Sequence, residues 1–264
     1  MLEKLKLYLI ALRNVFLGGN LFSLQLISKP SLFVGTISTL LFYSKTLTGK
    51  SRLEQKNPDE IIQSNKKYEI KIDTDCYFWG NDASYVKDII TLCIITKLVD
   101  AKNIFEIGTL DGYTALHFAM NSPVNTKVYT LDLPPDGSEI PSLRSTAIDV
   151  AHQDQHAVIK KYRFQIPSVI EKVFTLFGDS ARFDYAPFIN KIDLFFIDGA
   201  HSYEYVKSDT LKALKCVRGG GIIVWHDYGR MGVNGVTKWL HEFAAQGNKV
   251  YSVPGSSLAY YIKK

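Results

Sequence analysis

The sequence Asn103-Ile-Phe-Glu-Ile-Gly-Thr-Leu-Asp-Gly-Tyr-Thr114 decides the fold class. Here an apolar strand runs into an acidic residue and two glycines four apart before helical spacing begins. In an open α/β sheet the ligand lies beyond the carboxyl end of such a strand, where glycines let backbone N–H groups come close to it. The pattern Glu106-x-Gly108-x-x-x-Gly112 lacks the glycine triplet of the dinucleotide fingerprint. We therefore predict a loop for a nucleotide-type cofactor without a pyrophosphate, held partly through a carboxylate.

The chain beyond this loop alternates apolar runs with helical spacing, and a helix is expected from Ala83 to Leu98. Five apolar runs separated by helical segments predict parallel strands, whereas two runs joined at Pro254-Gly255 predict an antiparallel hairpin. The expected fold is therefore α/β with a mixed seven-stranded sheet. The predicted strands are 104–107, 127–131, 173–177, 193–197, 221–225, 249–253 and 258–262.

Residues 1–67 differ in composition from the rest. They hold ten Lys and Arg against four Asp and Glu, so of the formal net charge of +5 this segment carries +6 and the remainder −1. The larger part has no broad basic face, which argues against nucleic acid as a partner. We expect two domains: a helical extension at 1–67 and a catalytic domain at 68–264. The end of the extension, from Ser51 to Lys67, is expected to contain a linker and a helix that begins at Pro58.

Only Lys29 is charged between Asn14 and Ser44, and Lys29-Pro30 divides the stretch into two uncharged runs of 15 residues. Each run is shorter than the roughly 20 residues of a membrane-spanning helix. This length favours a helical cap or a contact in a homo-oligomer, while peripheral membrane contact through residues 1–45 stays open as the alternative. Three dispersed cysteines and the lack of a secretory signal pattern predict a cytoplasmic location.

Between Leu133 and Lys172 lies an insertion of about forty residues that contains four prolines. Insertions of this length beyond a sheet edge are commonly substrate lids.

The predicted parallel strands end in polar residues, and their carboxyl ends share one sheet edge. Asp132 follows the second strand, 24 residues after Gly108, and suits the hydroxyls of a ribose. Asp179 and Ser180 follow the third strand. They suit an adenine amino group or, equally, an ordinary helix N-cap.

Asp198 and Asp227 end the fourth and fifth strands. If these strands are neighbours about 4.8 Å apart, the two carboxylates share one cleft and repel each other unless a cation lies between them. A divalent metal such as Mg²⁺, with His226 as a further ligand, would meet this need, although imidazole also suits manganese or iron. His201, three residues after Asp198, is a candidate general base with a pKa near neutrality. No role is assigned to His117, His152, His156 or His241.

Residues from about 76 to 264 resemble the class I S-adenosylmethionine-dependent methyltransferases, in particular the small-molecule O-methyltransferases that include macrolide sugar methyltransferases and cephalosporin hydroxylase-like proteins. The motifs that carry the resemblance are Phe105-Glu-Ile-Gly-Thr-Leu-Asp-Gly112, Leu131-Asp132, Gly178-Asp-Ser180, Phe196-Ile-Asp-Gly-Ala-His-Ser-Tyr203 and Gly220-Gly-Ile-Ile-Val-Trp-His-Asp-Tyr228.

The resemblance implies a Rossmann-like, doubly wound sheet. It also implies that Glu106, Gly108 and Thr109 border the methionine part of S-adenosylmethionine, that Asp132 holds the ribose, and that Asp179 and Ser180 lie near adenine. Asp198 and Asp227 would be metal ligands and His201 the base. Metal-dependent relatives often carry an acidic residue where this chain has His226.

The expected function is S-adenosylmethionine-dependent O-methylation of a hydroxylated small molecule or sugar, with assistance from a divalent metal. Two alternatives stay open. One is an NAD(P)-dependent oxidoreductase on a similar sheet, and the other is a non-enzymatic, membrane-associated protein that keeps the fold.

Overall fold

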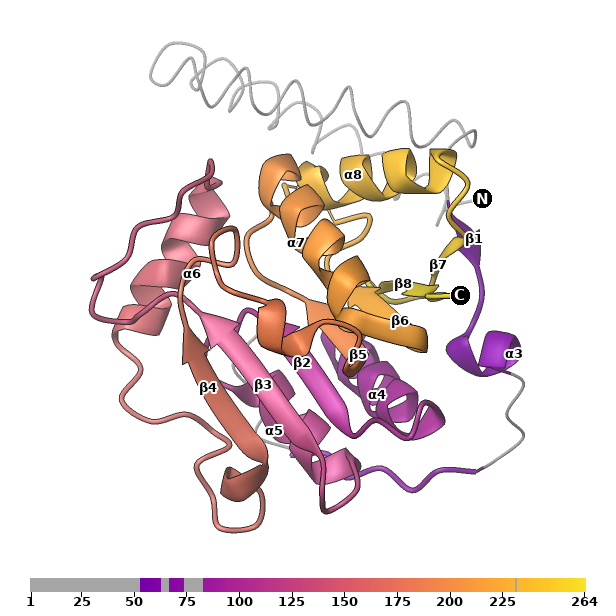
Figure 1. The fold of residues 1–264 in the computed structure, drawn as a ribbon, viewed down its shortest axis with the longest axis horizontal. Helices are drawn as coiled ribbons and strands as arrows, with labels where there is room; N and C mark the ends of the chain where they lie inside the picture. The colour runs from indigo at the N-terminus through magenta and orange to yellow at the C-terminus, as the bar shows by residue number, and fades with distance from the viewer. Residues whose placement is uncertain (1–52, 63–66, 74–82, 231) are drawn as a thin grey trace, which may run out of the picture. The chain divides into compact units, whose positions relative to one another are not determined.

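The computed structural model describes residues 53–62, 67–73, 83–230 and 232–264. In this part of the chain, eight strands form one mixed sheet in the order β1-β7-β8-β6-β5-β2-β3-β4 (Figure 1). The strands β4, β3, β2, β5 and β6 pair in parallel, and β8 pairs antiparallel with both β6 and β7. The predicted α/β fold with its C-terminal antiparallel hairpin is confirmed.

The strands are β1 (Glu54–Gln55), β2 (Asn103–Ile107), β3 (Lys127–Asp132), β4 (Val173–Phe177), β5 (Ile192–Ile197), β6 (Val217–Trp225), β7 (Val250–Ser252) and β8 (Ala259–Ile262). The helices are α3 (Pro58–Ile62), α4 (Ala83–Leu98), α5 (Tyr113–Asn121), α6 (Ala147–Ala157), α7 (Tyr203–Cys216) and α8 (Asn234–Ala245), with short 3-10 turns η2 (Ile170–Lys172) and η3 (Ala186–Phe188).

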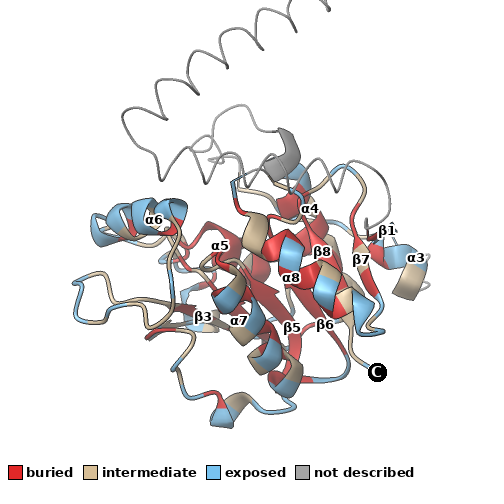
Figure 2. Ribbon diagram, turned by 90° about the horizontal axis from the view of Figure 1, so that it is seen from above, coloured by how far each residue is buried: buried red, intermediate tan, exposed pale blue. Residues whose placement is uncertain are grey.

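Two hydrophobic cores lie on opposite faces of the sheet, because successive strand residues point to alternate sides. Ile104 of β2 packs with α4 and α5 on one face, whereas Phe105 packs with residues that include those of α7 and α8 on the other. Figure 2 shows the central strands β5 and β6 buried between these layers, while the outer surface of α6 is exposed. Because both faces of the sheet are covered, nearly every residue of the central strands is apolar.

The sheet has one strand more than predicted. Glu54 and Gln55 pair with Tyr251 and Ser252, so β1 adds to the edge formed by β7. The sheet therefore takes up residues from before the boundary expected at residue 67. Residues 1–52, which hold most of the expected N-terminal extension, lie outside the described residues.

Within the described ranges, no helix combines the length and apolar character needed to cross a membrane. The segment 1–45, for which membrane contact was considered, is not among those ranges.

The order in which successive strands are added to the sheet reverses between β2 and β5, although these strands run parallel. From β2 the chain moves outward through β3 to β4 and then returns to β5, on the other side of β2. Ligands of open α/β sheets bind in the crevice beyond the carboxyl ends of the strands at such a reversal. The fold thus directs attention to the loops after β2, β3, β5 and β6.

Candidate active site

A cavity of about 360 Å³ opens at this edge of the sheet. Its volume lies within the range of small-molecule sites. Nine of the residues predicted for the site line it: Gly108, Thr109, Asp132, Asp179, Ser180, Asp198, His201, His226 and Asp227. Glu106 and Gly112 are the two predicted residues outside this lining.

Gly108 lets the loop after β2 pass directly against the end of β5. Its φ is +98°, and a Cβ atom there would lie 2.1 Å from the carbonyl oxygen of Asp198. Gly112 has a φ of +80° and forms the N-cap of α5, where a Cβ atom would lie 2.5 Å from the Phe164 ring. The first glycine therefore shapes the cavity wall, whereas the second packs against the insertion.

Asp132 fixes the conformation of the cofactor loop. Its Oδ2 atom accepts hydrogen bonds from the backbone N–H groups of Thr109 and Leu110, both at 2.9 Å, and Oδ1 accepts one from Leu133 N–H. An ionised carboxylate has about four acceptor positions, so one stays available on a residue that lines the cavity. This position can receive a ligand hydroxyl.

Glu106 supports the same loop from outside the cavity lining. The side chain is buried, and the Thr130 hydroxyl donates to its Oε2 at 2.5 Å while lying 2.7 Å from the Thr109 hydroxyl. Burial raises the pKa of Glu106 well above its ordinary value, despite the hydrogen bond from Thr130. Glu106 is thus linked to the loop through two threonines, and its expected contact with a cofactor stays a prediction.

Asp179 ties the end of β4 to the insertion and to α7. Its carboxylate accepts from the backbone N–H groups of Ser142 and Ala181 and from the Tyr205 hydroxyl. Burial opposes ionisation, but these hydrogen bonds outweigh it and hold the pKa of Asp179 below its ordinary value. Ser180 lies beside Asp179 on the cavity wall.

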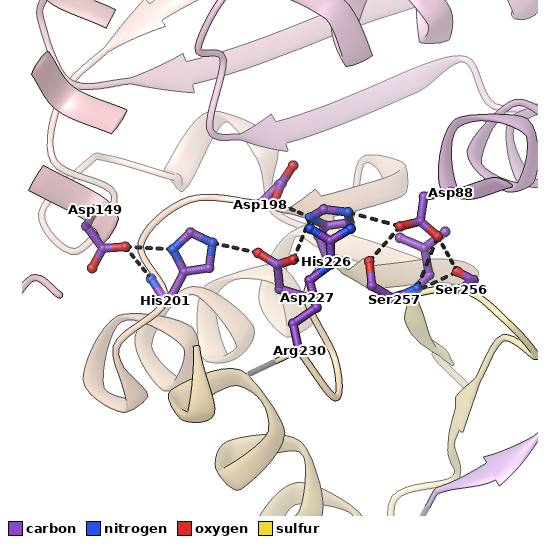
Figure 3. A network of polar contacts seen from close by, with 10 residues as sticks. Asp88, Asp149, Asp198, His201, His226, Asp227, Arg230, Ser256 and Ser257 are labelled. Carbon is purple, nitrogen blue, oxygen red and sulfur yellow. Dashed lines mark hydrogen bonds and ion pairs between the residues drawn. The ribbon is translucent and has the colours of Figure 1, made fainter. Parts of the chain in front are cut away.

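A row of alternating carboxylates and imidazoles crosses the site (Figure 3). His201 lies between Asp149 and Asp227, with Nδ1 2.6 Å from Asp149 Oδ1 and Nε2 2.8 Å from Asp227 Oδ2. His226 lies between Asp227 and Asp88 in the same row.

Burial would lower the pKa of His201, but the hydrogen bonds to Asp149 and Asp227 raise it to about 9. This arrangement therefore favours a higher pKa for His201 than the predicted value near neutrality. One cause is Asp149, a partner 52 residues away in sequence that lies on α6.

His226 is held by three carboxylates. Its Nδ1 lies 2.9 Å from Asp198 Oδ1 and 3.4 Å from Asp227 Oδ1, and its Nε2 lies 3.2 Å from Asp88 Oδ2. Burial opposes the charged imidazole, yet the charges of Asp198 and Asp227 raise the pKa of His226 well above its ordinary value. Asp88, on α4, also accepts from both Ser256 and Ser257, so it anchors His226 to the β7–β8 turn.

The donors suit a divalent cation. Asp198, His201 and Asp227 each offer one ligand atom, and these atoms lie within 4.8 Å of one another. The predicted set of Asp198, Asp227 and His226 is also close together, through the contacts of His226 Nδ1. Two carboxylates with one imidazole match the ligands of manganese, iron or zinc and, less well, magnesium.

The region that carries most of this site is similar to a known protein family. Residues 105–228 match the protein family described as a methyltransferase domain. This region is similar to a methyltransferase domain. The match spans the cofactor loop, the insertion, and both Asp198 and Asp227.

One curated relative is tricin synthase 1 from Oryza sativa subsp. japonica. It is 28% identical over 163 residues, which cover 60% of this chain and 57% of that protein. The alignment thus spans little more than half of the relative's length.

Solved structures share the fold of most of this chain. A putative O-methyltransferase from Klebsiella pneumoniae has a TM-score of 0.50 and 19% identity, covering 70% of this chain and 83% of its own. The O-methyltransferase NovP also has a TM-score of 0.50, with 14% identity over 69% of this chain and 80% of its own. At these identities the likeness concerns the fold.

The candidate site also includes residues to which the sequence pattern gave no role. Asp149, His152 and His156 of α6 line the cavity, and Asp88 holds His226. A sequence signal existed for Asp149, because Thr146-x-x-Asp149 has the spacing of a capping box. That signal predicts the start of a helix, but it does not predict the contact of Asp149 with His201 after β5.

Proposed function

We propose that this chain is an S-adenosylmethionine-dependent O-methyltransferase that acts on a hydroxylated small molecule or sugar. One observation carries the proposal: the cofactor loop with Asp132 and the cluster of Asp198, His201 and Asp227 line a single cavity. The family match of residues 105–228 supports the reaction class. The family match and the missing glycine triplet together argue against the alternative function, an NAD(P)-dependent oxidoreductase.

The cofactor end of the cavity fits S-adenosylmethionine. The remaining acceptor position of Asp132 suits a ribose hydroxyl, and Asp179 with Ser180 suits the adenine. Gly108 and Thr109 border the space expected for the methionine part, while Glu106 holds Thr109 through Thr130. When bound, the cofactor supplies an electrophilic methyl group.

The acceptor end would orient a hydroxyl group and remove its proton. His201 Nε2 lies 2.8 Å from Asp227 on the cavity wall. Because the pKa of His201 is raised to about 9, the neutral imidazole that can take a proton becomes more abundant as the pH rises, and it would accept the proton from a hydroxyl that replaces Asp227 at Nε2. Asp198 and Asp227, with His226 or His201, would hold a divalent cation that stabilises the negative charge of the deprotonated oxygen. Positioning of the hydroxyl against the methyl group supplies a further part of the rate gain.

Calorimetric titration of the full chain with S-adenosylhomocysteine tests the cofactor assignment. We expect binding by the wild type and a loss of at least tenfold in affinity for Asp132→Ala, since the loop then loses the hydrogen bonds to its N–H groups. Asp136→Ala is the matched control, because Asp136 is an exposed carboxylate of the same connection. Failure of the wild type to bind would overturn the proposed function.

Methyl transfer from radiolabelled S-adenosylmethionine to catechol, phenol and methyl glucoside tests the acceptor class. The assay is run with a chelator and then with Mg²⁺ or Mn²⁺. Turnover that depends on the added metal supports metal assistance, and equal turnover in the chelator contradicts it.

For the extension at 1–67 we propose a contact in a homo-oligomer, on the strength of its short apolar runs. Light scattering of the full chain would give a mass above that of one copy. A monomer that floats with anionic vesicles would instead support the peripheral membrane contact of residues 1–45.

A further inference from the structure

One face of α6 runs along the cavity. Asp149, His152 and His156 are spaced by three and four residues, so they lie on the same side of the helix, and all three line the cavity. The helix belongs to the insertion between β3 and β4, which was expected to act only as a lid. Its inward face carries groups that can take part in the chemistry.

Asp149 makes two contacts with His201 through one oxygen. Asp149 Oδ1 accepts a hydrogen bond from the His201 backbone N–H at 2.9 Å and lies 2.6 Å from the ring Nδ1. The first contact fixes the loop that carries His201, and the second fixes the rotation of its ring. The opposite ring nitrogen, Nε2, is thereby held 2.8 Å from Asp227 (Figure 3).

The other oxygen of Asp149 anchors the carboxylate to its own helix. Asp149 Oδ2 accepts from the Thr146 backbone N–H, and the Thr146 hydroxyl accepts from the Asp149 N–H, which completes a capping box. Burial opposes ionisation of Asp149, but the contacts with His201 and Thr146 outweigh it and lower its pKa. A buried and fully engaged carboxylate of this kind can hold an imidazole in one orientation.

Capping alone does not account for these contacts. A capping box needs only the reciprocal bonds between Thr146 and Asp149. The two additional bonds to His201 join the insertion to the loop after β5, and they hold the imidazole that the proposed function uses as the base.

We propose that Asp149 is the positioning residue of His201, so that the insertion supplies part of the proton-transfer apparatus. The proposal rests on the proposed methyltransferase function. Asp149 acts through His201 in this proposal. It fixes the ring of His201 so that Nε2 points towards Asp227 on the cavity wall, where the acceptor hydroxyl would bind.

The test compares four variants of the full chain: Asp149→Ala, Asp149→Asn, Thr146→Ala and Asp154→Ala. Thr146→Ala removes one half of the capping box but keeps the Asp149 carboxylate. Asp154→Ala removes an exposed carboxylate from the same helix. Each variant is measured for turnover with the best acceptor among the three probes, for affinity towards S-adenosylhomocysteine, and for the ¹H–¹⁵N signal of the hydrogen-bonded His201 Nδ1–H after labelling of histidine.

We expect Asp149→Ala to lower kcat by about 10- to 100-fold, the usual effect of removing a carboxylate that orients an imidazole, with unchanged cofactor affinity. Its downfield Nδ1–H signal disappears. Asp149→Asn should keep part of the turnover, because the amide oxygen still accepts a hydrogen bond. Thr146→Ala and Asp154→Ala should keep both turnover and signal.

Turnover of Asp149→Ala within twofold of the wild type would overturn the proposal. So would an equal loss in Thr146→Ala, since helix capping would then explain the effect. If Asp149→Ala does not fold, Asp149→Asn carries the same comparison. Failure of the wild type to bind S-adenosylhomocysteine would refute the proposed function, whereas the Nδ1–H signal would still report on the orientation of His201.

Discussion

Gly108 lies where the loop after β2 passes the carboxyl end of β5. An added Cβ atom would have to share space with the backbone of Asp198, which cannot move away as a flexible side chain would. The position also has a φ of +98°, where residues other than glycine are strained. The residue thus controls the distance between the cofactor loop and the proposed metal ligands.

We expect Gly108→Ala to lower the free energy of unfolding by roughly 2–4 kcal/mol, from backbone strain together with overpacking. Binding of S-adenosylhomocysteine should also be lost. Gly137→Ala is the matched control: its φ is +72°, but nothing lies within 4 Å of the added atom. Urea unfolding and calorimetry check both variants, and similar losses in the two would show that the clash with Asp198 has no effect.

The residues at the strand ends were predictable from sequence because each follows an apolar run. Asp132, Asp198 and Asp227 needed only the rule that parallel strands end at a common edge. Asp88 and Asp149 were not predictable in this way. They reach the site on helices from other parts of the chain, and their contacts depend on tertiary packing that no local spacing records.

At the scale of elements, helical spacing and apolar runs were sufficient for the longer helices and strands. The predicted helix from Ala83 to Leu98 and the strand from Val173 to Phe177 have the bounds that the structure gives. β1 was missed, since Glu54-Gln55 is two residues long and has no apolar character. It is a strand only because the edge of β7 offers backbone groups to pair with.

The last turn of α6 brings His156 to the cofactor end of the cavity. His156 is buried, with Nε2 3.0 Å from the Tyr162 hydroxyl and Nδ1 3.8 Å from Asp132 Oδ1. We expect His156→Ala to weaken binding of S-adenosylhomocysteine by about five- to tenfold, or roughly 1 kcal/mol, because Asp132 loses a packed neighbour. Calorimetry measures the effect. Gln155→Ala, at an exposed position of the same turn, should bind as the wild type does, and an equal loss there would contradict the assignment.

At the scale of the whole molecule, the stability of the fold should depend on a carboxyl group that lies outside the cavity lining. Asp209 of α7 is fully buried, and burial raises its pKa from 3.8 to about 7. In the unfolded chain this group ionises near pH 4, whereas in the folded domain it stays protonated up to about pH 7. Its stabilising contribution is therefore complete below pH 4 and is lost as the pH rises to about 7.

Asp209→Asn isolates this contribution, because asparagine has nearly the same shape and does not ionise. Acidification also affects Asp88, Asp149 and Asp179, whose pKa values are lowered in the folded chain, so the wild-type curve alone would mix opposing effects. The difference in unfolding free energy between the two proteins removes those shared groups. It should shift by roughly 2–3 kcal/mol in favour of Asp209→Asn between pH 5 and pH 8. Urea unfolding at several pH values measures it, and a difference that stays constant would mean that Asp209 ionises alike in the folded and unfolded chains.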